Sequence, residues 1–242
     1  MWSNYFLQIK KKYSMQVSSK EPLVINLDGK NVTGNSKINI IEIYKGSFRD
    51  ILEQSARYFS KKYTCFAIFG ADEISFIFEE PMKLIDDLNS DRNTFSTEIV
   101  SVFSQYFFDY FNSNLNNTDK IFWHGKCFSI HLNKINSFIK YKSRLMQVLT
   151  TTYFLKHKGI PNAGIIKLDK KIEMCETYND YVQQRDSQKG TLYYSGKKID
   201  IEKYLNGSIV EIDNEENNFS NDHIITQNVK LDDTMFDDIL NL

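Results

Sequence analysis

The order in which strand-like and helix-like segments alternate constrains the fold more than any other feature of the sequence. Apolar residues recur at helical spacing over residues 48–63 and again over 95–111. Short apolar runs rich in β-branched and aromatic residues are typical of buried strands; they cover residues 22–27, 65–69, 74–78 and 121–130. The resulting order, β-α-β-β-α-β, predicts an α+β domain of the ferredoxin-like, palm type. Such a domain has a four-stranded antiparallel sheet with both helices on one face.

The sequence that follows the palm pattern changes character twice. Residues 134–158 form a long helical pattern with apolar side chains such as Phe138 and Met146 directed inward, and shorter elements follow. From Glu211 to the end, nine acidic residues stand against the single Lys230. We therefore expect a palm domain over 1–133, a long helix with a helical and irregular extension packed on the palm over 134–210, and an acidic tail over 211–242.

Charge and cysteine content narrow the class of protein. The first 210 residues carry 29 basic and 22 acidic residues. This excess suits a polyanionic ligand such as a nucleoside triphosphate or RNA, but it is equally explained as a basic surface. The three cysteines (Cys65, Cys127 and Cys175) have unrelated spacings, which is not the pattern of a disulfide framework. With neither a long apolar run nor the pattern of a signal peptide, the sequence predicts a cytoplasmic protein without membrane contact.

Acidic side chains mark two predicted turns that the palm topology brings together. Asp28 ends the first strand in an Asp-Gly turn, and Asp72 and Glu73 lie in the hairpin turn between the second and third strands. Both turns open on one edge of the sheet, where clustered carboxylates suit a pair of Mg²⁺ ions and phosphoryl transfer. Gly29 permits close backbone approach to a phosphate, and Lys30 adds a positive charge. Each aspartate is explained equally well as an ordinary turn residue, so the residues alone leave both interpretations open.

Basic residues outside these turns have two interpretations. Lys140, Lys142 and Arg144 fall on the polar side of the long helical pattern, and Lys126 falls on the fourth strand. They either grip a triphosphate or RNA backbone or belong to a solvated surface.

Five segments resemble motifs of the tRNA(His) guanylyltransferase-like enzymes, the 3′–5′ nucleotide polymerases. The two specific ones are LVINLDGKNV at 23–32, similar to the family's strand and Asp-Gly-Arg motif, and GADEISF at 70–76, similar to its Ser-Asp-Glu hairpin. Three weaker ones follow in the family's order: WHGKCF at 123–128, FIKYK at 138–142 and QRDSQKG at 184–190. Together they span roughly residues 20–195.

The resemblance implies a palm-type nucleotidyltransferase with two Mg²⁺ ions. The ions would be held by Asp28, Asp72 and the carbonyl of Gly29, and the catalytic residues would be Asp28, Asp72 and Glu73. A triphosphate, GTP and/or ATP, would be bound by Asp28, Gly29, Lys30, Asn31, Val32, Thr33, Ala71 and Asp72. The resemblance further implies tRNA or another RNA as a partner and assembly into a homo-oligomer.

Departures from the family's motifs leave the acceptor open. Lys30 stands where the family has arginine, Thr33 where it has histidine, and Ala71 where it has serine. The segment 143–149 does not match the part of the family's helix that helps bind an activated RNA end. The main expectation is nucleotide addition to an RNA 5′ end. The alternatives are a cyclase or oligonucleotide synthetase that makes a signalling nucleotide, and a non-catalytic nucleotide- or RNA-binding module.

Overall fold

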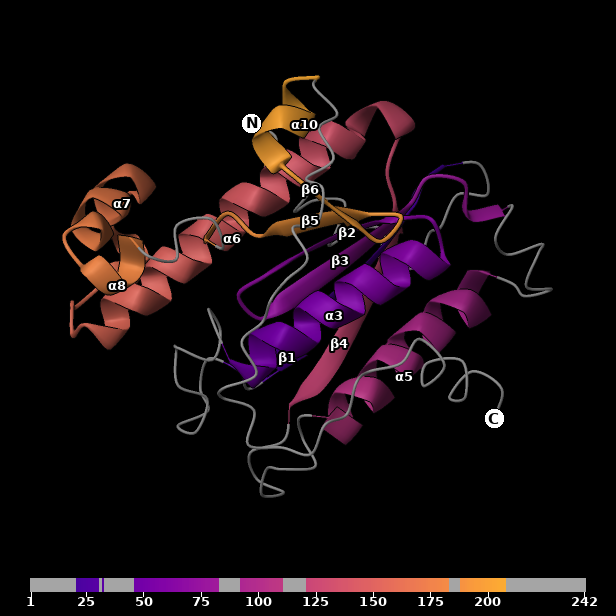
Figure 1. Ribbon diagram of the computed structural model, residues 1–242, viewed down its shortest axis with the longest axis horizontal. Helices are drawn as coiled ribbons and strands as arrows, with labels where there is room; N and C mark the ends of the chain where they lie inside the picture. Colours follow the sequence, from indigo (N-terminus) through magenta and orange to yellow (C-terminus); the bar gives the residue numbers. More distant parts are fainter. Residues whose placement is uncertain are drawn as a thin grey trace.

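The computed structural model describes residues 21–30, 32, 46–82, 92–110, 121–182 and 188–207 (Figure 1). The acidic tail predicted for 211–242 lies outside the described residues, as do Asn31 and Thr33. None of the described helices is both long enough and apolar enough to cross a lipid bilayer.

The predicted palm order is confirmed. Its elements, in chain order, are β1 (Leu23–Lys30), α3 (Ser47–Lys62), β2 (Phe66–Gly70), β3 (Glu73–Phe78), α5 (Arg92–Tyr110) and β4 (Phe122–Ser129). The four strands lie in the order β4-β1-β3-β2, and every neighbouring pair is antiparallel. β1 and β3 are therefore adjacent, as the split βαβ arrangement requires.

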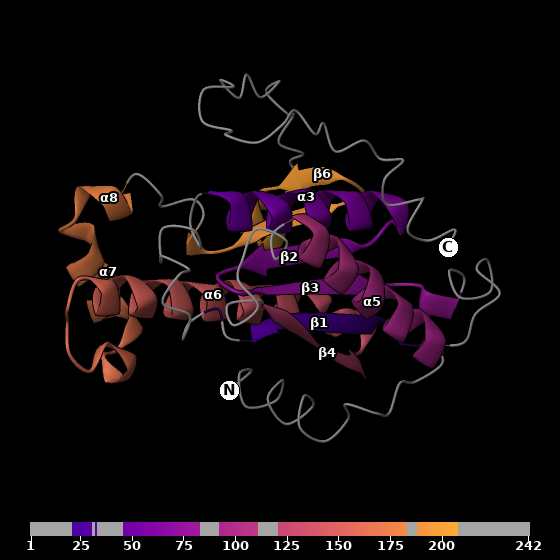
Figure 2. The same ribbon diagram turned by 90° about the horizontal axis from the view of Figure 1, so that it is seen from below.

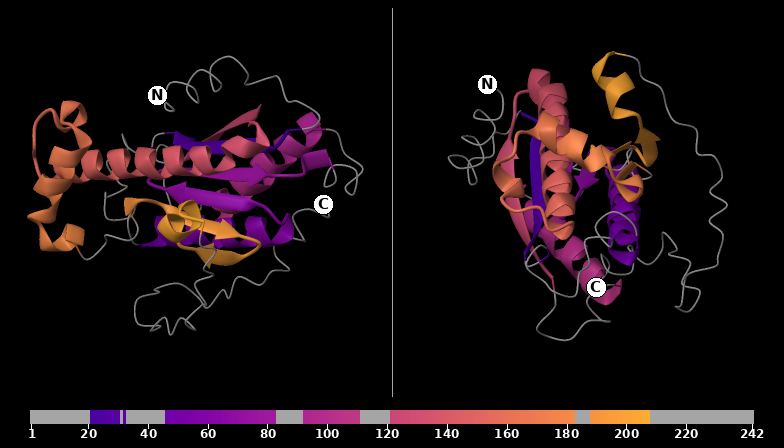
Figure 3. Two further views of the ribbon diagram at one scale, coloured as in Figure 1. Left: turned by 90° about the horizontal axis from the view of Figure 1, so that it is seen from above. Right: turned by 90° about the vertical axis from the view of Figure 1, so that its left-hand side faces the viewer.

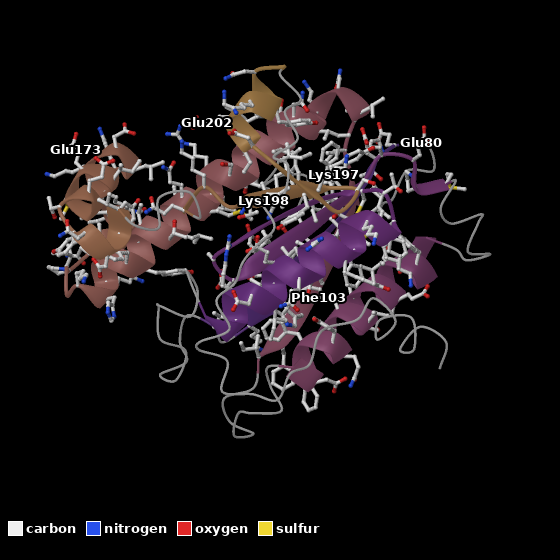
Figure 4. All side chains as sticks on the ribbon, viewed as in Figure 1. Glu80, Phe103, Glu173, Lys197, Lys198 and Glu202 are labelled. Atoms are coloured by element: carbon white, nitrogen blue, oxygen red, sulfur yellow. The ribbon has the colours of Figure 1, made fainter. Side chains whose placement is uncertain are left out.

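Two short strands that the sequence did not predict extend this sheet. β5 (Thr191–Tyr194) pairs with β2, and β6 (Lys197–Ile199) pairs with β5, so the full order is β4-β1-β3-β2-β5-β6. In Figure 4 the labelled Lys197 and Lys198 lie on β6, at the sheet edge opposite β4. The region after the palm thus contributes strands as well as helices.

Successive side chains of a strand point to opposite faces of the sheet, so the core consists of two apolar layers, one on each face. One face of the sheet packs against α3 and α5 through a largely aromatic cluster. Phe103, labelled in Figure 4, lies at its centre, with its ring centroid 4.8 Å from that of Trp123 and 6.3 Å from that of Phe76. In Figure 2, α3 and α5 lie in front of the sheet and α6 lies behind it. Both palm helices therefore cover one face, as predicted.

The long helix α6 (Ile135–His157) covers part of the other face. It follows a 3-10 turn (Leu132–Lys134) and packs against β2, with Phe138, Ile139 and Met146 in a second apolar cluster. Figure 3 (left) shows α6 in front of the sheet when the molecule is seen from above.

The helical extension packs on the C-terminal half of α6. It comprises α7 (Leu168–Glu176) and α8 (Asn179–Val182), while α10 (Ile201–Leu205) lies near the first half of α6 (Figure 1). The carboxylate of Asp200 caps α10 by accepting hydrogen bonds from the backbone N–H groups of residues 202 and 203. The contacts of α7 and of α10 with α6 join the extension to this helix.

The expected turn at Asp28-Gly29 is not formed. β1 continues through both residues to Lys30, because β3 and β4 both pair with Asp28 and the ladder with β4 continues to Lys30. Asp28 is paired with Glu73 of β3 and with His124 of β4, and Gly29 is paired with Trp123. Ladder pairing on two sides outweighs the local turn preference of an Asp-Gly pair.

Candidate functional site

Asp28, near the end of β1, meets the β2–β3 turn where the inner strands of the sheet end. Asp28 is the cross-strand partner of Glu73, and the backbone N–H of Gly29 donates to the carbonyl oxygen of Asp72 at 2.9 Å. The strand register therefore brings together Asp28, Asp72 and Glu73, the three carboxylates singled out from the sequence.

Two backbone features allow this close approach. A side chain at Gly29 would place its Cβ 3.2 Å from the carbonyl oxygen of Asp72 and 2.7 Å from Cγ2 of Val32, so glycine is required there. The hairpin turns tightly at Ala71, which adopts a left-handed φ of 50° and is buried. A non-glycine residue in this conformation costs roughly 1 kcal/mol. The turn that carries Asp72 is thus maintained against a local backbone preference.

The electrostatics of the turn leave negative charge poorly compensated. Asp72 is only 7% exposed. Burial, followed by the charges of Asp28 and Glu73, raises the pKa of the Asp72 carboxyl to about 7. The positive charge of Lys142 lowers the pKa of Asp72, but its effect is the smallest of those that act on this carboxyl. A cation bound between Asp28 and Asp72 would relieve the repulsion.

Lys142 forms a buried polar network with the strands, which corrects the prediction that it belongs to the outer face of the helix. The residue is buried, and its Nζ donates to Oε1 of Glu73 at 2.8 Å and to Oδ1 of Asn26. Ser75 also donates to Asn26 Oδ1, at 3.0 Å. Lys140 and Arg144 of the same helix are exposed.

The helical spacing explains why Lys142 points inward. Position 142 follows 135, 138 and 139 at intervals that place all four on one face, so the lysine belongs to the apolar stripe. Its charge suggested the outer face, although the spacing was the stronger signal. Asn26 and Ser75, on the same side of the sheet, were not singled out at all.

A pair of glycines lets α6 approach the site. A Cβ at Gly70 would lie 2.9 Å from the sulfur of Met146 and 3.1 Å from the Cα of Gly190. A Cβ at Gly190 would lie 2.4 Å from that sulfur. Met146 therefore fills the space that two missing side chains leave, and it lies one helical turn after Lys142. This packing places Lys142 beneath the turn.

The residues present fit a magnesium site. Mg²⁺ is usually held by one or two carboxylates, with water and substrate phosphates completing its shell. Asp28 and Asp72 supply two such groups, and the raised pKa of Asp72 marks a site where a cation would be favourable. Across the described part of the chain, no cluster of three or more His, Cys, Asp or Glu side chains is arranged to hold a metal ion. Ions at this site would therefore depend on substrate oxygens.

The residues predicted to bind the triphosphate differ in their exposure to solvent. Lys30 is exposed at the end of β1, whereas the side chains of Val32 and Ala71 are buried in the aromatic core. The N–H of Gly29 is already used by Asp72, so it does not serve a phosphate. Of the described groups of this strand, the side chain of Lys30 is therefore the one that could contact a triphosphate.

Comparison with known proteins gives a structural likeness only. No protein-family model matches the sequence, and no curated protein matches it. Among solved structures, the chain is similar to a bacterial tRNA(His) guanylyltransferase-like protein in complex with ATP, at 13% identity and a TM-score of 0.49, over 80% of this chain and 84% of that one. It is also similar to a bacterial protein of the same description in complex with GTP, at 12% identity and a TM-score of 0.49, over 81% of this chain and 84% of that one.

The tRNA(His) guanylyltransferase from Saccharomyces cerevisiae is similar at 18% identity and a TM-score of 0.48, over 80% of this chain and 94% of that one. These solved structures are of the kind that the sequence motifs resemble.

Proposed function

We propose that this chain is a cytoplasmic, Mg²⁺-dependent nucleotidyltransferase that uses nucleoside triphosphates, GTP and/or ATP. The observation that carries the proposal is the meeting of Asp28 and Asp72 at one edge of a palm-ordered sheet, with the charge of Asp72 poorly compensated. A carboxylate pair of this kind is what metal-assisted phosphoryl transfer requires. The motifs at 23–32 and 70–76 point to the same chemistry.

Each residue has a separate part in the proposed reaction. Asp28, Asp72 and the Gly29 carbonyl would hold two Mg²⁺ ions, which would supply positive charge to offset that of the triphosphate during transfer. Lys30 binds triphosphate oxygens. Glu73, paired with Lys142, holds the turn in place.

The acceptor follows from the fate of a labelled triphosphate. The chain is incubated with α-labelled GTP or ATP and Mg²⁺, with and without RNA bearing a 5′-triphosphate. Label that moves onto RNA supports nucleotide addition to an RNA end. A small labelled product formed without RNA supports the cyclase or oligonucleotide synthetase alternative.

Substitution of the carboxylates tests the site itself. Asp28→Asn and Asp72→Asn should each reduce turnover at least about 100-fold, since each removes a metal ligand. Asp169→Asn, an exposed carboxylate in the first turn of α7, is the matched control and should retain full activity. Full activity in either site variant would disprove the metal assignment, and no turnover by the unmodified chain with any triphosphate would favour a non-catalytic binding module. Light scattering measures the homo-oligomer that the motif resemblance implies.

A further inference from the structure

The edge strand β4 carries exposed side chains directly beside Asp28. In the register of β1 and β4, Lys30 is paired with Phe122, Asp28 with His124 and Asn26 with Lys126. Paired residues project from the same face of a sheet. Phe122, His124 and Lys126, here called the β4 strip, therefore project from the same face as Asp28 and Lys30.

This face is covered by α6 at one end of β4 and open at the other. Phe128 lies on the same face of β4 as the strip, but it is only 2% exposed. Its ring centroid is 5.9 Å from that of Phe138 in α6. Phe122 at the other end is 57% exposed, and His124 and Lys126 are also exposed. The strip begins where the cover of α6 ends, and it runs alongside Asp28, which is paired with its middle residue, His124.

The basic side chains on and beside the strip are not engaged in polar contacts within the described structure. Neither Lys126, His124 nor Lys30 makes an ion pair or hydrogen bond with another described residue. An exposed aromatic ring among basic side chains is the combination that sites for single-stranded nucleic acids use.

The spacing and chemistry of the strip fit a nucleotide chain. Alternate residues of a strand lie about 7 Å apart, which is similar to the separation of successive phosphates in an extended single strand. An aromatic ring stacks on any base, and lysines bind phosphates. A duplex hides its base faces, so the exposed Phe122 favours a single strand.

We propose that the β4 strip binds a single-stranded nucleotide chain and holds it beside Asp28, at the proposed site of nucleotide transfer. Phe122 stacks on a base, Lys126 binds the backbone, and His124 lies between them opposite Asp28. This proposal rests on the proposed nucleotidyltransferase function and gives it a polynucleotide acceptor. The chemistry is shared by RNA and DNA, which the experiment separates.

Binding is measured without catalysis, by fluorescence anisotropy of a labelled 12-nucleotide single strand of RNA in the absence of triphosphate and Mg²⁺. Phe122→Ala should weaken binding roughly tenfold through lost stacking. Lys126→Ala should weaken it several-fold and lower the slope of log affinity against log salt by about 1. Lys170→Ala, an exposed lysine on α7, is the matched control. Phe122 lies largely outside the core, and thermal unfolding checks that its variant is folded.

The outcomes separate this proposal from the proposed function. Unchanged affinity in both strip variants, or equal affinity for a 12-base-pair RNA duplex, would overturn the strip. If Asp72→Asn binds the single strand normally but transfers no nucleotide, both proposals stand. If the carboxylate variants keep full activity while Phe122→Ala loses binding, the strip stands and the metal site fails. A matching DNA strand tells whether the 2′-hydroxyl contributes.

Discussion

The Nζ of Lys142 lies 2.8 Å from Oε1 of Glu73, and both side chains are almost completely buried, at 2% and 5% exposure. The pair joins α6 to the residue that follows Asp72 in the β2–β3 turn. A lysine that the sequence left unassigned is therefore part of the support of the candidate site.

Replacing Lys142 by methionine should strongly destabilise the fold. The substitution keeps the length of the side chain but leaves Glu73 and Asn26 buried without their cation. Breaking one side of a buried ion pair costs about 3–5 kcal/mol. Urea unfolding followed by circular dichroism measures the change.

Two further variants show whether the loss acts through Glu73. Combining Lys142→Met with Glu73→Gln removes both charges and should recover much of the stability lost in the single variant. Lys140→Met, at an exposed position of the same helix, should stay within about 0.5 kcal/mol of the unmodified protein. Losses that simply add in the double variant would contradict coupling between Lys142 and Glu73.

Asp72→Asn should stabilise the metal-free protein at pH 8 while removing activity. The pKa of Asp72 is raised in the fold to about 7, so the protonated carboxyl is the form that the fold favours. Its contribution to stability is complete below the unfolded pKa near 4 and is lost as the pH rises through 7. Asparagine cannot ionise, so the variant should gain on the order of 2 kcal/mol at pH 8 and much less at pH 5. Urea unfolding in chelator at both pH values measures the gain; an equal gain at both would contradict the raised pKa.

Magnesium should stabilise the unmodified protein at pH 8. A cation between Asp28 and Asp72 offsets their repulsion, and a ligand that binds only the folded state raises its stability by mass action. An excess of Mg²⁺ about tenfold above its dissociation constant corresponds to about 1.4 kcal/mol. Thermal unfolding with and without MgCl₂, at ionic strength matched with NaCl, measures this. The gain should vanish in Asp28→Asn and in Asp72→Asn, and a gain that persists in both would place the ion elsewhere.

Gly190→Ala should destabilise the fold more than the matched change Gly159→Ala. Both glycines have a positive φ, of 82° and 77°, so both variants bear the backbone cost of roughly 1 kcal/mol. A Cβ at Gly190 also meets Met146 at 2.4 Å, whereas one at Gly159 meets nothing within 4 Å. Overpacking adds about 1–3 kcal/mol at Gly190 alone. Denaturant midpoints of the two variants give the difference, and equal costs would mean that α6 shifts without penalty.

The palm order was predictable because its elements have clear periodicity. β1, β2 and β3 are short apolar runs, and α3 carries its apolar residues at helical spacing, so local pattern and final packing agree. β5 and β6 were missed because they are only four and three residues long. Such strands are defined by the edge of β2 that they pair with, which a local pattern does not contain.

The candidate site was predictable in its carboxylates but not in its support. Asp28 and Asp72 were singled out because acidic residues follow apolar strands at neighbouring positions of a known topology, and the motif resemblance then implied that they bind metal. The inward direction of Lys142 depends on the partners Glu73 and Asn26, which lie far away in the sequence. The extension of β1 through Gly29 likewise depends on β4. In both cases, contacts with residues distant in the sequence outweighed the preference of the local sequence, for a solvated lysine in one case and for a turn in the other.

The pairing of β5 with β2 has a consequence for synthesis of the chain. All five residues of β2 are buried, and the edge that β5 covers stays bare until residues 191–194 have left the ribosome. A nascent or truncated chain that ends before them would present an apolar strand with unpaired backbone groups, which invites aggregation. A recombinant fragment cut at the end of the palm pattern is therefore expected to be poorly soluble, although it contains every carboxylate of the candidate site.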